Sequence, residues 1–221
     1  MPDMSLPVVN PAPHPAQAWF ESPHGRALLD SEQVQVAAAL HERPAQAWLW
    51  LAPLAAVVDG AGVADGQCLS PGAGDWGRAH RFATPFSIPA ESLGTVVLQH
   101  VLDGAPDPAL LDECWRLLAA GGCLWLFALN PLAPYRWNWR GTGLGGTEPL
   151  LWRRRLRRAG FAPEAVSQGI GPRWHPQVDA ALQSGAGMRA AYLLRAEKRA
   201  SGLTPIRKRQ PQPLRTQAAT A

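Results

Sequence analysis

Polar and aromatic residues that could do chemistry follow two apolar runs of the chain. His100 comes directly after the apolar run 93–99, and Asn130 comes directly after the apolar run 123–129. In residues 135–140, aromatic side chains then alternate with two arginines and one asparagine. A histidine at the end of a strand can act as a general base or contact a substrate. Aromatic side chains interleaved with basic ones are typical of surfaces that stack nucleic-acid bases.

The same residues also have structural interpretations, which the sequence leaves open. His100 can cap its strand and pack in a loop, and Asn130 with Pro131 can form a turn that lines a cleft. Residues 135–140 can form a lid or anchor the following loop. Five arginines crowd the helix that comes next: Arg153, Arg154, Arg155, Arg157 and Arg158. They form either a solvated face or, with the basic residues 207–209, a surface that binds an anion.

Three apolar runs and one amphipathic stretch predict the elements that position these residues. Residues 47–51, 93–99 and 123–129 are apolar without alternation, which indicates strands buried on both faces of a parallel sheet. An Asp-Pro start followed by apolar side chains at helical spacing predicts a helix over 107–120. A strand, a helix and a strand in this order form a βαβ unit, whose two strands are parallel.

The other elements and the limits of the domain follow from composition. Further helices are expected from 22 to 43 and over 148–159, and further strands near 67–70, 80–83, 161–166 and 190–194. Five prolines in residues 1–18 predict a flexible Pro-rich arm. Residues 202–221 are basic and contain Gln and Pro, which predicts a basic flexible tail. A single domain, 19–201, lies between them.

Composition excludes several classes of protein. The chain has 221 residues, and its 47% hydrophobic content excludes a wholly disordered protein. The longest apolar run, 47–58, contains Pro53 and is shorter than the roughly 20 residues that a membrane span needs. No secretion signal is visible at the N-terminus. Because Cys68, Cys114 and Cys123 lack the spacing of metal ligands, we expect reduced thiols, no metal site and a cytoplasmic location.

Charge is distributed unevenly along the chain. Residues 1–151 carry 7 Lys and Arg against 14 Asp and Glu, whereas residues 152–221 carry 14 against 3. The formal net charge of +4 therefore combines a net −7 with a net +11. This split is a reason to consider an anionic partner for residues 152–221.

The middle of the chain resembles a known family. The segments concerned are Phe-Ser-Ile at 86–88, Ser-Leu-Gly at 92–94, His-Val-Leu at 100–102 and Arg-Leu-Leu-Ala-Ala-Gly-Gly at 116–122. They resemble class I S-adenosylmethionine-dependent methyltransferases, and most of all the small bacterial proteins with a type 11 methyltransferase domain. The resemblance covers roughly residues 19–207. It implies an α/β, Rossmann-like class I methyltransferase fold: an open, mostly parallel sheet with helices on both faces and an antiparallel final hairpin.

The resemblance also implies roles for particular residues. His100 would be the catalytic base or would orient the acceptor. The residues expected at the cofactor are Leu51, Ala52, Leu54 and Phe86, and those expected in the substrate cleft are Asn130, Tyr135 and Trp137. The acceptor of the methyl group, a small molecule or a macromolecule, is not implied.

The chain departs from the family where the cofactor binds. The family has a glycine-rich turn after its first strand, because side chains there would collide with the methionine and ribose. This chain has Ala52, Pro53 and Leu54 in that turn. It also lacks a carboxylate at 69–71, where the family has an acidic residue that holds the ribose hydroxyls. We therefore expect binding of S-adenosylmethionine to be weak or absent.

Three functions remain as hypotheses. The first is a S-adenosylmethionine-dependent methyltransferase-like protein with a divergent cofactor site and an unknown acceptor. The second is a catalytically inactive pseudo-methyltransferase that acts as a binding or regulatory module. The third, which rests on the basic residues 152–221 and on the aromatic and basic residues 135–140, is a nucleic-acid-associated protein. Binding of the cofactor distinguishes the first from the second.

Overall fold

A computed structural model describes most of the chain. The described residues are 13–56, 65–72, 75, 76, 78, 81–105 and 107–199. The expected tail, 202–221, and residues 1–12 of the expected arm lie outside them. No helix among the described residues is both long enough and apolar enough to cross a bilayer.

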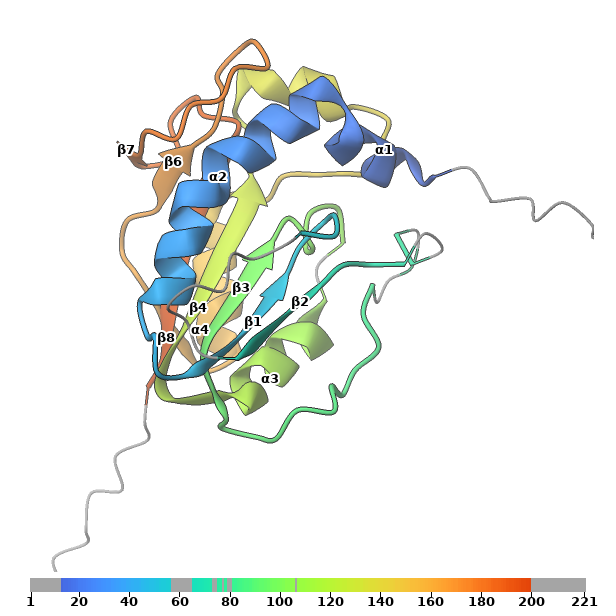
Figure 1. Cartoon of the computed structure of the whole chain (residues 1–221). Helices are drawn as coiled ribbons and strands as arrows, with labels where there is room; N and C mark the ends of the chain where they lie inside the picture. Colours follow the sequence, from blue (N-terminus) through green and yellow to red (C-terminus); the bar gives the residue numbers. More distant parts are fainter. Residues whose placement is uncertain are drawn as a thin grey trace, which may run out of the picture.

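The centre of the fold is an eight-stranded sheet with the order β2-β1-β3-β4-β8-β6-β7, in which β5 pairs with β8 (Figure 1). The strands are β1 (Ala47–Leu51), β2 (Gly66–Leu69), β3 (Leu93–Gln99), β4 (Leu118–Leu129), β5 (Phe161–Pro163), β6 (Gln168–Ile170), β7 (Gln183–Ser184) and β8 (Ala191–Lys198). Strand β1 is parallel to β2 and β3, and β3 is parallel to β4. Strand β8 is antiparallel to β4, β5 and β6. The predicted mostly parallel sheet with antiparallel final strands is confirmed.

Helices cover both faces of this sheet, as expected. Alternate residues of β1 point to opposite faces, so Trp48 and Trp50 pack under α2 (Pro23–His41). Leu49 and Leu51 belong to the other core, which also holds the buried residues of α3 (Pro108–Leu117) and α4 (Pro149–Arg158). The predicted start of α3 is confirmed, because the Asp107 carboxylate accepts the backbone N–H of Leu110 at 3.2 Å.

The folded part begins earlier than residue 19, where the sequence placed the start of the domain. Helix α1 (Pro15–Glu21) starts with a proline, and the side chain of His14 caps it by accepting the backbone N–H of Ala16. Proline at the first position of a helix removes only an N–H that has no partner within the helix, so it does not prevent helix formation. Ala16 is completely buried, which fixes α1 against the domain.

The boundary between α3 and β4 also differs from the prediction. The helix ends at Leu117, three residues before the expected end, and Leu118 already has the extended backbone of β4. Leu118 pairs with Leu93, but the next pair along β3 joins Thr95 to Cys123. Residues 119–122 therefore form an irregularity within the strand, and its two glycines are not a helix cap. A side chain on Gly122 would come within 2.9 Å of a backbone oxygen.

The segment before β3 is irregular where a strand was expected near 80–83. Arg81, Phe82 and Ala83 are described there, and none of them is in a strand. The guanidinium of Arg81 is instead buried and donates to backbone carbonyl groups after β3. The short strands β6 and β7 and the 3-10 helix η1 (Pro134–Trp139) were not predicted. Each is too short to give a periodic pattern.

Candidate functional site

The order of the strands identifies the place where a ligand would be expected. From β1 the chain moves to one side to form β2, and it then returns to the other side of β1 to form β3. Open α/β sheets bind ligands at such a switch point, beyond the carboxyl ends of the strands. Ala52 follows β1 at this edge, and His100 follows β3. Helix α1 lies beyond the arrowheads of these strands (Figure 1).

His100 is completely buried at the switch point, between two carboxylates. Its Nδ1 lies 2.7 Å from Oδ2 of Asp103, and its Nε2 lies 2.9 Å from Oε1 of Glu32, which α2 contributes. The network extends into the sheet, because Gln99 donates to the same Glu32 carboxylate and accepts from the indole N–H of Trp50. Asp103 also accepts the backbone N–H of Leu129 at 3.0 Å. The network thus joins β1, α2 and β3 to the end of β4, with His100 between the two carboxylates.

The charge of His100 follows from these contacts. Burial by itself lowers the pKa of His100, but the charge of Glu32 and the hydrogen bonds that the ring donates to both carboxylates raise the pKa to about 10. At neutral pH the ring is therefore an imidazolium that donates both of its N–H groups. An imidazolium has no free lone pair, and no part of this ring is exposed. In this conformation His100 holds the network together, and it has no lone pair with which to take the proton of an acceptor, the role that the resemblance implied.

The backbone at His100 is held in an uncommon conformation. Its backbone φ is 56°, in the left-handed region that residues other than glycine seldom adopt. Arg81 fixes this turn by donating to the carbonyl oxygens of Val101 at 3.0 Å and Asp103 at 2.7 Å. The guanidinium of Arg81 also lies 4.8 Å from the ring centre of Trp76. Arginine, imidazolium and two carboxylates give this buried cluster no formal net charge.

Aromatic side chains close the switch point above His100. The ring of Phe20, from α1, lies 5.5 Å from the ring of His100 and 5.7 Å from the ring of Trp76, measured between centres. Phe20 is completely buried, and Trp76 is 3% exposed. Leu54, in the turn after β1, packs against the same cluster. Side chains of the protein therefore occupy the space beyond the strands where a ligand of this fold would lie.

The residues at the switch point do not fit S-adenosylmethionine. Leu51 and Ala52 are buried, and the N–H of Ala52 is already bonded to the carbonyl of Leu69 at 2.9 Å. The residues after β2 include no carboxylate before Asp75, which forms an ion pair with Arg78 at 3.0 Å. Neither the close approach nor the ribose contact that the family uses is available from these groups.

Phe86, the other residue expected at the cofactor, lies beside α3. Its N–H donates to the carboxylate of Glu113 at 2.8 Å, and its carbonyl accepts from Arg116. Its ring packs against the core on that face of the sheet. Leu51, Ala52 and Leu54 follow one another at the end of β1, but their side chains belong to three different hydrophobic clusters, and Phe86 packs against the cluster that holds Leu51.

Two of the three residues expected in the substrate cleft have structural partners instead. Asn130 is completely buried, and its amide donates to the carbonyl oxygens of Gly187 and Arg189 at 2.9 Å each. The hydroxyl of Tyr135, which is 1% exposed, donates to the carbonyl of His24 in α2. Trp137 differs from both, because it is 60% exposed.

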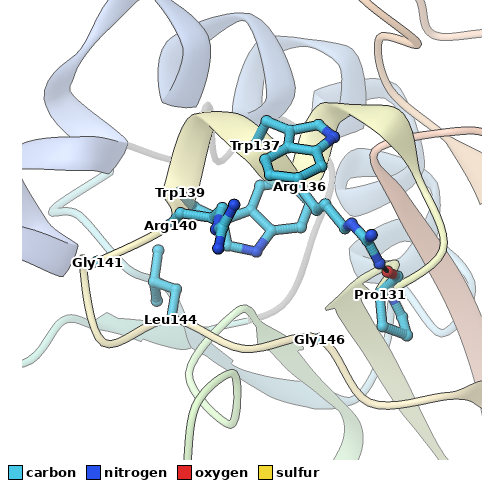
Figure 2. Close-up of a pocket in the computed structure, with 8 residues that line it drawn as sticks. All are labelled: Pro131, Arg136, Trp137, Trp139, Arg140, Gly141, Leu144 and Gly146. Atoms are coloured by element: carbon cyan, nitrogen blue, oxygen red, sulfur yellow. Dashed lines mark hydrogen bonds between the residues drawn. The ribbon is translucent and has the colours of Figure 1, made fainter.

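Trp137 lines a cavity of about 450 Å³ between η1 and the loop that follows it (Figure 2). The other lining residues are Pro131, Arg136, Trp139, Arg140, Gly141, Leu144 and Gly146. Figure 2 shows the side chains of Arg136 and Arg140 on either side of the Trp139 indole, which lies beneath the Trp137 ring in this view. Among the predicted site residues, Trp137 is the one that faces this opening.

Three of the basic residues in 152–199 are already engaged with carboxylates. Arg189 pairs with Asp179, and Arg195 pairs with Glu42. Lys198 lies 3.2 Å from Glu91 and is buried. The exposed arginines of α4 remain as the basic surface: Arg154, Arg157 and Arg158.

Glu32, Asp103 and Arg81 were not predicted as site residues, although one signal for them was present in the sequence. Leu28, Glu32 and Val36 follow one another at intervals of four residues on the buried face of α2. A carboxylate on such a stripe needs a buried partner, since an unpaired buried charge is strongly unfavourable. His100 is 68 residues away, so only the tertiary structure identifies it as that partner.

No protein-family model matches the chain, and no curated protein sequence matches it. A solved SAM-dependent methyltransferase from Thermotoga maritima, described as a possible histamine N-methyltransferase, is similar in structure, with a TM-score of 0.56 and 18% identity over 83% of this chain and 94% of that chain. A chain in a complex of the Haloferax volcanii Trm112 methyltransferase activator with a methyltransferase has a TM-score of 0.54 and 14% identity, over 84% of this chain and 98% of that one.

These likenesses agree with the order of the strands and with the helices on both faces of the sheet. Identities of 18% and 14% are too low to carry an activity over to this chain, but they do establish the architecture. The chain has the fold of class I S-adenosylmethionine-dependent methyltransferases.

Proposed function

We propose that this protein is a pseudo-methyltransferase: a methyltransferase fold that serves as a binding module and transfers no methyl group. The observation that carries the proposal is the closed cluster at the switch point. There Phe20 covers His100, and His100 is held between Glu32 and Asp103. Methyl transfer requires the donor and the acceptor to be aligned in one site. The side chains of the protein occupy that place.

Energetics support the same proposal. Charge-assisted hydrogen bonds are worth roughly 1.5–3 kcal/mol each. Residues 70–72, directly after β2, offer the ribose no carboxylate for such bonds, and Asp75 is paired with Arg78. Admission of the cofactor would also displace Phe20 and Trp76, which are buried against each other. Removal of a large aromatic side chain from a core costs about 3–5 kcal/mol. We expect cofactor affinity weaker than about 100 μM, since each 1.4 kcal/mol is a factor of ten.

The fold itself favours a second candidate, a methyltransferase with a divergent cofactor site. Two solved structures with TM-scores of 0.56 and 0.54 come from methyltransferase systems. For this candidate to hold, α1 and the segment around Trp76 would move away from the switch point when the cofactor binds. His100 would then lose the cover of Phe20, and the acceptor would lie near the end of β3.

Calorimetric titration with S-adenosylmethionine and S-adenosylhomocysteine tests the proposal. The unmodified protein is titrated beside Phe20→Ala, which opens the switch point, and Trp174→Ala, an exposed tryptophan far from it in the sequence. We expect no saturable binding by the unmodified protein or by Trp174→Ala. Micromolar binding by the unmodified protein would refute the proposal. Circular dichroism of each variant shows that the chain is folded, so absence of binding is interpretable.

A partner for the basic part of the chain is a separate proposal. Arg154, Arg157 and Arg158 are exposed on α4, and none of them has a carboxylate partner within the described part of the chain. An anionic partner would neutralise these charges. Replacement of all three by glutamine, with heparin as the probe, tests whether α4 contributes to such a surface.

A further inference from the structure

The cavity beneath Trp137 is distinct from the switch point. It is formed by η1 and by the loop 140–146, both of which follow β4, whereas the switch point lies beyond β1 and β3. Its volume, about 450 Å³, falls in the range of small-molecule sites, which is roughly 300–1,000 Å³. The cavity is accessible from solvent, because Trp137 is 60% exposed.

Two guanidinium groups stand at this cavity without an acidic partner. Neither Arg136 nor Arg140 forms an ion pair with a carboxylate in the described part of the chain. Arg136 donates to the carbonyl of Pro131 at 3.1 Å, which uses one of its five N–H donors and fixes the direction of its side chain. Figure 2 shows Arg136 reaching toward Pro131 while Arg140 lies on the other side of the space.

The indole of Trp137 holds both arginines in place. The guanidinium carbon of Arg140 lies 4.5 Å from the ring centre, and that of Arg136 lies 5.5 Å from it. A guanidinium stacked on an aromatic ring keeps the N–H groups of its edge free, and these N–H groups match the oxygens of a phosphate. Two such groups at one cavity are therefore a preorganised site for a phosphate.

The rest of the cavity is suited to a flat, apolar group. Trp137 presents a large exposed ring, and Leu144 and Trp139 form apolar parts of the wall. Trp139 is 4% exposed and packs against Trp19, so this part of the wall is rigid. Nucleic-acid bases stack on exposed aromatic rings of this kind, whatever their identity.

We propose that this cavity binds a nucleoside phosphate, with the base stacked on the exposed part of the Trp137 ring that the two guanidinium groups leave uncovered and the phosphate held by Arg136 and Arg140. This proposal rests on the proposed function, because it names the class of ligand that the binding module would bind. The nucleoside phosphate is either a free nucleotide or one unit of a single-stranded nucleic acid. S-adenosylmethionine is a poorer ligand for this cavity, because it carries a positive sulfonium next to the ribose, where a nucleotide carries its phosphate, and its carboxylate lies farther from the base.

Competition experiments test the assignment. A fluorescently labelled single-stranded RNA and the labelled mononucleotide are the probes, and AMP, adenosine and inorganic phosphate are the competitors. We expect AMP to compete at least about tenfold better than either adenosine or phosphate, because the two halves of the ligand bind to two parts of one cavity. If the RNA binds and AMP competes only weakly, the ligand is a single-stranded nucleic acid. If AMP binds directly, the ligand is the free nucleotide.

Variants connect the binding to this cavity. Trp137→Ala and the double variant Arg136→Gln/Arg140→Gln should each weaken binding by about tenfold or more. Trp174→Ala and Arg26→Gln/Arg173→Gln are matched controls, since they remove an exposed tryptophan and two exposed arginines that do not line the cavity. These controls should bind like the unmodified protein.

Two results would overturn the assignment. One is equal loss of affinity in the cavity variants and in their matched controls, which would indicate nonspecific attraction of charge. The other is absence of binding by RNA and by AMP at low ionic strength. Failure of the proposed function is a different result, namely saturable binding of S-adenosylmethionine that persists in Arg136→Gln/Arg140→Gln.

Discussion

Replacement of Glu32 by glutamine tests the buried network at the switch point most directly. The glutamine has nearly the same size, so Glu32→Gln removes a charge and leaves no cavity. His100, which is completely buried, then keeps only Asp103 as an acidic partner. Removal of one member of a buried ion pair costs about 3–5 kcal/mol. We expect a loss of this size in the free energy of unfolding at neutral pH, measured by urea denaturation.

The dependence of this loss on pH gives a sharper test. The pKa of His100 is raised from its ordinary 6.5 to about 10 in the folded protein. The folded state therefore binds a proton more tightly than the unfolded state does, and the stabilisation is fully present below the unfolded pKa. It is lost as the pH rises through 10. At about 1.4 kcal/mol per pKa unit, the unmodified protein should lose on the order of 3–4 kcal/mol between pH 7 and pH 10.

The variant should show a smaller slope over the same range. Without Glu32 the pKa of His100 falls toward its ordinary value, so fewer protons are released on unfolding above pH 7. Other groups that titrate in this range are common to both proteins, and the difference between the two curves isolates His100. Asp30→Asn, an exposed carboxylate on the same helix, is the matched control. Either of two results would refute this account: the unmodified protein has the same free energy of unfolding at pH 7 and pH 10, or Glu32→Gln and Asp30→Asn have the same free energy of unfolding.

Two further predictions concern the helices. Gly25→Ala should reduce the free energy of unfolding by about 1–3 kcal/mol, because the new methyl group would collide with the carbonyl oxygen of Trp19 where α1 meets α2. Urea denaturation measures this loss, and unchanged stability would show that α1 does not pack closely against the start of α2. Replacement of Arg154, Arg157 and Arg158 by glutamine should lower affinity for heparin and reduce its dependence on salt, because three exposed charges are lost. Unchanged retention on a heparin column would leave α4 as a solvated face.

Much of the central sheet could be predicted from sequence because its signals are local. The bounds of β1 and β3 are those expected from the apolar runs, since a strand buried on both faces is apolar over most of its length. The Asp107 cap and Pro108 fixed the start of α3 in the same way. The predicted end of that helix was wrong, because Leu118 pairs with Leu93 and belongs to the sheet, and no local signal in the sequence reveals that contact.

The candidate site was predictable only in its position. The turn without glycine after β1 and the missing carboxylate after β2 are visible in the sequence, and they indicate that the cofactor would be poorly held. What fills the site is not visible, because Phe20, Glu32 and His100 come from distant parts of the chain. The sequence suggested a base at His100, whereas its environment makes it an imidazolium.

Residue types thus determined which elements form, and tertiary structure decided what their side chains do. Trp137 and Tyr135 lie two positions apart in the same aromatic and basic segment, and the sequence assigned both to a cleft. Folding buries Tyr135 against α2, where its hydroxyl bonds to His24, and leaves Trp137 exposed over a cavity with two arginines. The physical reason is that side-chain chemistry is set by neighbours, and the neighbours of a residue in a fold are mostly far away in the chain.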